Sequence, residues 1–213
     1  LRHIQSLDSR RVFRSNIFKK EDLEFGGGEE RQHSRAFLKI QDGCNSFCTY
    51  CVIPFARGKS RSLSIEGLCE RVNELEAKGF KEVVLTGVHI GDYEDAGLDL
   101  CDLVEGLLLK TTMPRFRLSS LEPIELSDRL LDFYSDPRMC RHFHMSIQSN
   151  SSKVLGLMKR KYTQVEVEAS LEKIEAQVPN AFVGMDVIAG FPGEDETEFL
   201  ETYARLSDLS WTK

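Results

Sequence analysis

Short apolar stretches alternate with longer amphipathic stretches along most of the chain. Each short stretch has the length and the alternation of a β-strand, and each longer one repeats its apolar residues at helical spacings of three and four. The predicted strands are 36–40, 82–87, 115–120, 142–147 and 182–190. The predicted helices are 64–79, 99–111, 127–135, 163–177 and 195–209. The pattern therefore predicts five consecutive strand and helix units.

Strands that alternate with helices of this length predict a parallel sheet with right-handed crossovers. Two α/β architectures fit, a doubly wound open sheet and a partial (β/α) barrel. Distinctive motifs follow every predicted strand, namely QDGC, TGVHIGD, SSLEP, QSNS and GFPGE. Because five strand ends converge on one site more readily in a curved sheet than at a single crevice, we predict the partial barrel.

Residues 1–34 are polar and charged and contain three consecutive glycines, so we predict an irregular N-terminal linker there. The regular core domain is expected over 35–213. The chain starts at Leu1 and ends just after an apolar run begins, so we expect it to be truncated from a longer protein, with the core incomplete at its C-terminal end.

Composition narrows the class of protein. Hydrophobic residues make up 41% and charged residues 29% of the chain, and no apolar run approaches the ~20 residues of a membrane span. No secretory signal is recognisable at the N-terminus, so we expect a cytoplasmic protein with no membrane partner. The net charge of −6 argues against binding nucleic acid through the general field, so any such contact must be local.

Three of the six cysteines, Cys44, Cys48 and Cys51, fall within eight residues as C-x3-C-x2-C. Thiolates are soft ligands that suit zinc or iron–sulfur clusters. The spacing would also align three buried thiols on one helical face, but Gly43 and Asn45 favour a turn. We therefore predict a metal-binding loop after the first strand.

Three thiolates leave two kinds of centre open. Zinc and most iron–sulfur sites take four protein ligands, and His89, His142 or His144 could complete a zinc site from other strand ends. Such a site would suit a non-catalytic RNA-binding module. A four-iron cluster held by three thiolates would instead leave one iron open to a cofactor or substrate.

The cysteine motif, with Tyr50 before its last cysteine, resembles the signature of radical S-adenosylmethionine (SAM) enzymes. The resemblance implies a 4Fe-4S cluster on Cys44, Cys48 and Cys51, whose open iron chelates SAM. It also implies reductive cleavage of SAM to a 5′-deoxyadenosyl radical, with the backbone around Tyr50 near the adenine. Such enzymes take their electron from a donor such as a flavodoxin or ferredoxin.

The resemblance extends over 35–213 through KIQDGCNSFCTYCVIPFARG, VVLTGVHIGDY, RLSSLEP, HMSIQSNSSKVLGLMKRKYT and DVIAGFPGE. Together these look like tRNA methylthiotransferases, and QDGC, TGVHIG and SSLEP most resemble the branch that acts on threonylcarbamoyladenosine beside the anticodon. The isopentenyladenosine and ribosomal-protein branches are the alternatives. Full-length members carry a second 4Fe-4S cluster in an N-terminal domain, of which 1–34 would be a remnant, and a C-terminal RNA-binding module.

The resemblance assigns cofactor-binding roles to residues at the strand ends. Gly87 would let backbone amides approach an anion such as the SAM carboxylate. Glu122, held extended by the following proline, would accept from the SAM amino group or ribose. Gln148 and Ser149 would hydrogen-bond the ribose or carboxylate.

Four further charged residues receive expected roles. Arg160 would reach the SAM carboxylate or a tRNA phosphate. Asp186 would point inward on the fifth strand, which would flank the adenine. Arg57 would steady the cofactor or the sulfur of the second cluster, and Lys59 would contact tRNA phosphate or remain in solvent.

Overall fold

The computed structural model describes residues 16–19, 23, 34–209 and 211–212. The three glycines of the expected linker lie outside the described residues, whereas Ile17–Lys19 forms a short 3-10 helix, η1. Phe18 of this helix packs edge-on against Phe55, with ring centroids 6.5 Å apart. Helix η1 of the predicted linker therefore lies against the segment that follows the cysteine motif.

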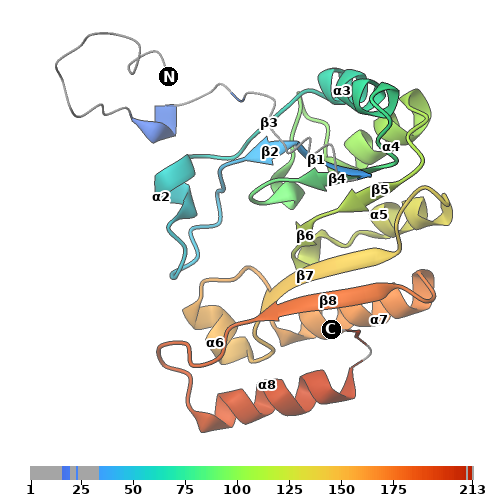
Figure 1. Ribbon diagram of the computed structural model, residues 1–213. Coiled ribbons are helices and arrows are strands. Elements are labelled where there is room, and N and C mark those ends of the chain that lie inside the picture. The colour runs from blue at the N-terminus through green and yellow to red at the C-terminus, as the bar shows by residue number, and fades with distance from the viewer. Residues whose placement is uncertain (1–15, 20–22, 24–33, 210, 213) are drawn as a thin grey trace.

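Parallel strands form the centre of the fold (Figure 1). In chain order the strands are β1 Arg35–Lys39, β2 Gln41–Asp42, β3 Arg61–Ser62, β4 Glu82–Thr86, β5 Phe116–Leu118, β6 Ser120–Leu121, β7 His142–Gln148 and β8 Phe182–Val187, of which β2 and β3 form a separate antiparallel pair. Strands β1, β4 and β5 pair in parallel, as do β6, β7 and β8. The backbone of Phe116 in β5 also bonds residues just before β7, and this isolated bridge links the two three-stranded groups.

Helices connect the strands and cover one face of the sheet (Figure 1). They are α2 Ile53–Arg57, α3 Ile65–Ala77, α4 Leu100–Lys110, α5 Asp128–Asp132, α6 Ser152–Leu157, α7 Gln164–Gln177 and α8 Glu196–Asp208, with 3-10 helices η2 Ile90–Asp92, η3 Pro123–Glu125 and η4 Phe133–Ser135. Side chains of Ser64, Asp99, Thr163 and Asp195 cap the longer helices at the amide groups that lack helical partners.

Alternation along the strands separates the two faces of the sheet. Residues such as Leu38, Leu85, Phe116 and Phe143 join the buried core beneath the helices. The strand residues that alternate with these point to the opposite face of the sheet, which we call the inner face. The inner face carries more polar groups than the core face. Its members include Arg35, Glu82, Arg117, His142, His144, Gln148 and Asp186.

The architecture confirms the predicted α/β fold with a parallel, partial barrel sheet. Each predicted strand and long helix is present within about three residues of its expected bounds. The stretch 115–120 is broken at Ser119 into β5 and β6, whereas we expected one strand. Helices α2 and α6 were not predicted, because five and six residues are too few to show a helical period.

Candidate active site

The cysteine loop begins where β2 ends and is closed at its base by antiparallel pairing of β2 with β3. Gly43 adopts φ of +80°, and an added Cβ would collide with the carbonyl oxygens of Gly58 and Lys59. The Cys44 amide donates to the Gly58 carbonyl over 3.1 Å. The loop can therefore turn sharply at Gly43 only because this position lacks a side chain.

The far side of the loop is attached to the end of α6. The Thr49 amide donates to the Met158 carbonyl over 3.1 Å, and the Thr49 hydroxyl donates to the Leu157 carbonyl over 3.0 Å. Cys51 N–H donates to the carbonyl of Cys48 over 3.0 Å. This loop has no regular helix across the three cysteines, as predicted.

A pocket of about 220 Å³ lies against the loop, at the carboxyl ends of β6 and β7. Its lining includes all three thiols, which are free. From the predicted cofactor set it also includes Tyr50, Glu122, Gln148 and Arg160. Residues separated by more than 100 positions in sequence thus surround one space, as convergent strand ends predicted.

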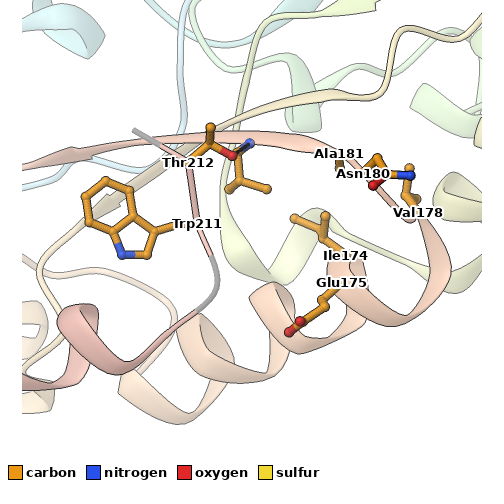
Figure 2. A pocket seen from close by; sticks show the side chains of 8 residues that line it. Ile174, Glu175, Val178, Asn180, Ala181, Trp211 and Thr212 are labelled. Carbon is orange, nitrogen blue, oxygen red and sulfur yellow. Dashed lines mark hydrogen bonds between the residues drawn. The ribbon is translucent and has the colours of Figure 1, made fainter.

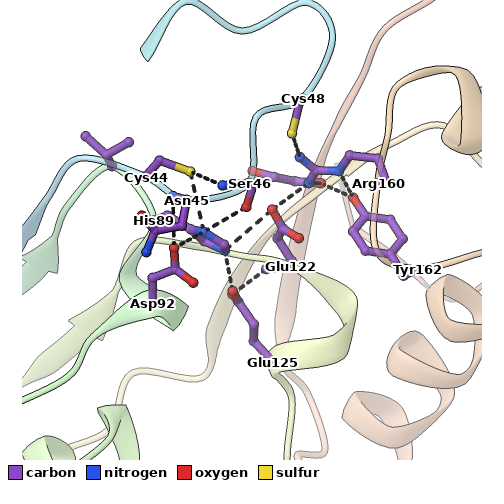
Figure 3. Close-up of polar contacts among 12 residues, drawn as sticks. Cys44, Asn45, Ser46, Cys48, His89, Asp92, Glu122, Glu125, Arg160 and Tyr162 are labelled. Atoms are coloured by element: carbon purple, nitrogen blue, oxygen red, sulfur yellow. Dashed lines mark hydrogen bonds and ion pairs between the residues drawn. The ribbon is translucent and has the colours of Figure 1, made fainter. Parts of the chain in front are cut away.

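Arg160 lies in the wall of this pocket, between Cys48 and Glu122 (Figure 3). Its guanidinium donates to Cys48 Sγ over 3.2 Å and to the Ser146 carbonyl over 3.0 Å, and Nη2 lies 2.9 Å from Glu122 Oε1. Nε donates to the Tyr162 hydroxyl over 2.8 Å. With only 6% of its side chain exposed, Arg160 lines the pocket, and its contact with the SAM carboxylate or with a tRNA phosphate stays a prediction.

Glu122 is buried beside this arginine, at the N-terminus of η3. Burial raises its pKa, and the neighbouring positive charges of Arg160 and His89 only partly oppose that effect. Its Oε1 atom faces His89 Nε2 over 3.5 Å. A carboxyl group held between two cations can accept from a ligand amino or hydroxyl group in the pocket.

His89 connects the cysteine loop with two carboxylates, Asp92 and Glu125, that were not among the predicted site residues (Figure 3). Its Nδ1 atom lies 3.1 Å from Asp92 Oδ2 and 3.8 Å from Cys44 Sγ. Nε2 lies 2.5 Å from Glu125 Oε1, an ion-pair distance without the alignment of a hydrogen bond. Burial lowers the pKa of His89, but Asp92, Cys44 and Glu125 outweigh burial and raise it to about 12.

Asp92 was detectable from sequence as the residue one 3-10 turn after His89. Glu125 was not, because η3 brings it from another strand end. The Cys44 thiol responds to this environment: burial raises its pKa, and hydrogen bonds from His89 and the Ser46 amide outweigh burial and lower it. A lowered thiol pKa favours the thiolate that metals bind.

Tyr50 and Gln148 occupy two further parts of the wall. Tyr50 is 41% exposed and packs edge-on against Phe191, and burial raises its pKa to about 12. Gln148 ends β7 with φ of +65°, next to an irregularity in the pairing of β7 with β8. This left-handed backbone, strained for a residue other than glycine, turns the chain at the pocket.

Two expected cofactor residues have other surroundings. The Ser149 side chain is fully buried, lies 3.2 Å from the Thr202 hydroxyl of α8 and accepts from the Ser151 amide. It does not line the pocket, so its contact with the cofactor stays a prediction. A Cβ at Gly87 would collide with Gln41, whose Oε1 already accepts from the Val88 and His89 amides. The amides expected to bind an anion are therefore occupied by the protein itself.

The remaining expected residues lie outside the pocket. Asp186 points to the inner face, as predicted, with Oδ2 3.3 Å from His144 Nε2. His144 Nδ1 lies 2.6 Å from the Ser120 hydroxyl, so it is held within the sheet rather than near the thiols. Arg57 pairs with Asp42 over 3.4 Å and is half exposed, and Lys59 is exposed on the same loop.

A second pocket, of about 350 Å³, lies between α7, the start of β8 and residues 211–212 (Figure 2). Its side chains are mostly apolar or neutral, with Glu175 as the one charged group in the lining. No thiol lines it, and it adjoins the amino end of β8. Although larger, this pocket lacks the groups for metal or cofactor chemistry.

The donor set of the first pocket fits a cluster with one open iron. Three thiols from one loop line it, no fourth cysteine does so among the described residues, and Arg160 donates to one sulfur. His142 and His144 do not line it, which removes two of the three histidines considered for zinc.

The model of the radical SAM superfamily matches residues 38–206. This chain belongs to the radical SAM superfamily. The match covers most of the chain, and the cofactors of the superfamily, a 4Fe-4S cluster and SAM, agree with the three-thiol pocket.

The curated relatives of this chain are tRNA methylthiotransferases. The chain is 46% identical over 177 residues to a threonylcarbamoyladenosine tRNA methylthiotransferase of Aquifex aeolicus, covering 82% of this chain and 43% of the relative. It is 41% identical over 209 residues to the Bacillus subtilis enzyme of the same name, covering 93% and 45%. A tRNA-2-methylthio-N(6)-dimethylallyladenosine synthase of Dictyoglomus thermophilum is 34% identical, covering 98% and 48%. The chain thus spans less than half of each of these relatives.

Solved structures support the fold. A radical SAM methyltransferase, TsrM, from Kitasatospora setae matches with a TM-score of 0.67 at 14% identity, covering 80% of this chain and 34% of that one. Coproporphyrinogen III oxidase from Escherichia coli matches with a TM-score of 0.59 at 16% identity, covering 82% and 41%. No helix in the described part of the chain has the length and apolar character to cross a membrane.

Proposed function

We propose that this chain is the radical SAM core of a tRNA methylthiotransferase that modifies N6-threonylcarbamoyladenosine beside the anticodon. The observation that carries the proposal is the pocket formed by three free thiols, Glu122 and Arg160, in a chain 46% identical to an enzyme of that name. The identity to the dimethylallyladenosine enzyme is lower, at 34%.

The three thiolates of Cys44, Cys48 and Cys51 would hold the 4Fe-4S cluster, which supplies the electron that cleaves SAM. Glu122 would accept a hydrogen bond from the SAM amino group or ribose, and Gln148 would bond the ribose or carboxylate from the end of β7. Arg160 keeps Glu122 in place and donates to the Cys48 sulfur. Gln41 keeps the turn after β4 closed against the pocket.

The full-length protein would contain more than this core, since the curated relatives are more than twice as long as the matched region. We propose residues 1–34 as the remnant of an N-terminal domain with the second cluster, 35–213 as the core, and tRNA as the macromolecular partner. A flavodoxin or ferredoxin would deliver the electron. With tRNA as its partner, the enzyme would act in the cytoplasm.

The test uses the full-length protein, reconstituted anaerobically with iron and sulfide and then reduced. With SAM and an anticodon stem-loop RNA containing threonylcarbamoyladenosine, we expect 5′-deoxyadenosine and methylthiolated RNA. Cys48→Ala should abolish both products, whereas Cys69→Ala, which alters a buried thiol of α3, should retain them.

Two results would contradict the proposal at different levels. Tight zinc at one equivalent per core, with no 5′-deoxyadenosine, would overturn radical chemistry. Methylthiolation of a dimethylallyladenosine RNA in place of the threonylcarbamoyladenosine RNA would overturn the assigned branch and leave the radical chemistry standing.

A further inference from the structure

Three arginines surround one carboxylate on the inner face of the sheet. Arg117 Nε lies 2.8 Å from Glu82 Oε1, and Arg115 Nε lies 3.1 Å from Glu82 Oε2. Arg35 Nε lies 4.0 Å from Oε1 of the same group. We call Arg35, Arg115 and Arg117 the basic floor, because they lie toward the amino ends of β1 and β5, away from the cysteine pocket.

The basic floor carries more positive charge than its partner neutralises. In the described part of the chain, Glu82 is the carboxylate that pairs with these three guanidiniums, which leaves two positive charges in excess. Burial raises the pKa of Glu82, but Arg117 and the other arginines outweigh burial and lower it, so Glu82 is ionised at neutral pH. Arg35 and Arg115 remain 50% and 56% exposed, and can meet a second anion.

The basic floor and the cysteine pocket share the inner face. Arg117 pairs in register with Val84 of β4, and Ser120, three residues further along the chain, lines the pocket. Three residues of strand span about 10 Å, and an arginine side chain covers a good part of that distance. His142 and Phe182 are the first residues of β7 and β8, and their rings stack with centroids 5.1 Å apart. Like the basic floor, they lie at the amino ends of the strands.

We propose that the basic floor binds a carboxylate of the substrate. This inference rests on the proposed function, in which the adenine base enters the pocket beside SAM. The threonylcarbamoyl group on N6 ends in a carboxylate about 5 Å from N6 when extended, judged from peptide bond lengths. Guanidinium groups bind carboxylates through paired hydrogen bonds, so the exposed Arg115 suits this group, and Arg117, which pairs with Glu82, adds its charge from the side nearer the pocket.

The same site would discriminate between modified adenosines. A dimethylallyl group has no charge, and it would leave the excess charge of Arg35, Arg115 and Arg117 without a partner. Because a site built for a polar group rejects a ligand that lacks it, the basic floor favours threonylcarbamoyladenosine. An RNA phosphate carries similar charge, so the experiment must separate the two sources.

The experiment measures binding of the full-length protein, loaded with cluster and SAM, to two anticodon stem-loop RNAs. The RNAs are identical except that one carries threonylcarbamoyladenosine and the other unmodified adenosine. We expect Arg117→Met to weaken binding of the first RNA about tenfold or more, as for loss of a charge-assisted hydrogen bond, and to leave the second unchanged. Arg71→Gln, on the solvent side of α3, is the matched control and should affect neither.

If Arg117→Met fails to fold, Arg115→Met carries the test, because its side chain is more exposed. If the substitution weakened the binding of both RNAs equally, the arginine would contact a phosphate, and the inference would be overturned. Unchanged binding of both would leave the arginines as partners of Glu82 alone and would also overturn it. If the wild-type protein methylthiolates neither a threonylcarbamoyladenosine nor a dimethylallyladenosine RNA, the proposed function itself fails, which is a separate result.

Discussion

Arg160 donates a hydrogen bond to the sulfur of Cys48 across 3.2 Å, although 112 residues separate them in the chain. The same guanidinium pairs with Glu122 over 2.9 Å. One buried cation thus connects the metal-binding loop to the strand end that faces the cofactor, and both contacts depend on the turn after α6.

Replacing Arg160 by methionine should destabilise the protein by about 3 kcal/mol, because Glu122 would keep a buried charge without its partner. Urea denaturation of the cluster-free protein measures this. The double variant with Glu122→Gln should recover part of the loss, and independent, additive effects would contradict the pairing. In the reconstituted protein, loss of the hydrogen bond and charge near Cys48 should lower the reduction potential of the cluster, which an EPR-monitored titration measures.

Gly43→Ala should disrupt the cysteine loop. The new Cβ would meet the backbone carbonyls of Gly58 and Lys59 at a φ of +80°, so we expect a loss of about 1 to 3 kcal/mol and less bound iron after reconstitution. The control is Gly156→Ala in α6, where nothing lies within 4 Å of the added carbon. That change should leave iron binding intact and stabilise the protein by up to about 1 kcal/mol. Full iron content in Gly43→Ala would show that the loop tolerates a side chain.

Glu82 predicts a pH dependence of stability. Since the neighbouring arginines lower its folded-state pKa, its contribution is present above the unfolded pKa of about 4.3 and is lost as the pH falls through the folded pKa. The Glu82→Gln variant should therefore lose stability less steeply below about pH 4.3, by at most about 1.4 kcal/mol per pH unit. Urea unfolding midpoints at several acidic pH values test this, and parallel curves for the two proteins would exclude the effect.

Ser149 and Glu122 should respond differently to substitution. Ser149→Ala removes a buried hydroxyl that contacts Thr202 and accepts from the Ser151 amide, so it should cost about 1 kcal/mol of stability and leave SAM affinity unchanged. Glu122→Gln should weaken SAM binding about tenfold, because the amide cannot offer the charged acceptor. Equilibrium binding of SAM to the reconstituted protein distinguishes them, and weaker binding by Ser149→Ala would contradict this assignment and support a cofactor contact of Ser149.

The periodicity of the chain was sufficient for the order of strands and helices, because each unit buries its own apolar face at a spacing that can be read locally. Cys44, Cys48 and Cys51 were also recognisable, since their spacing and the glycine before them constrain a short loop. The inward orientation of the Asp186 side chain was predicted from the alternation along its strand alone. These features depend on residues close together in sequence.

Only the tertiary structure decided which strand-end residues meet. In the folded chain the Ser149 side chain contacts α8, and Gln41 Oε1 accepts from the amide that follows Gly87. Glu125 reaches His89 from another strand end. The tertiary structure also gathered Arg35, Arg115 and Arg117 around Glu82, which lies on a third strand. Such contacts depend on the register of parallel strands and on the packing of connecting turns, and neither leaves a local signal in the sequence.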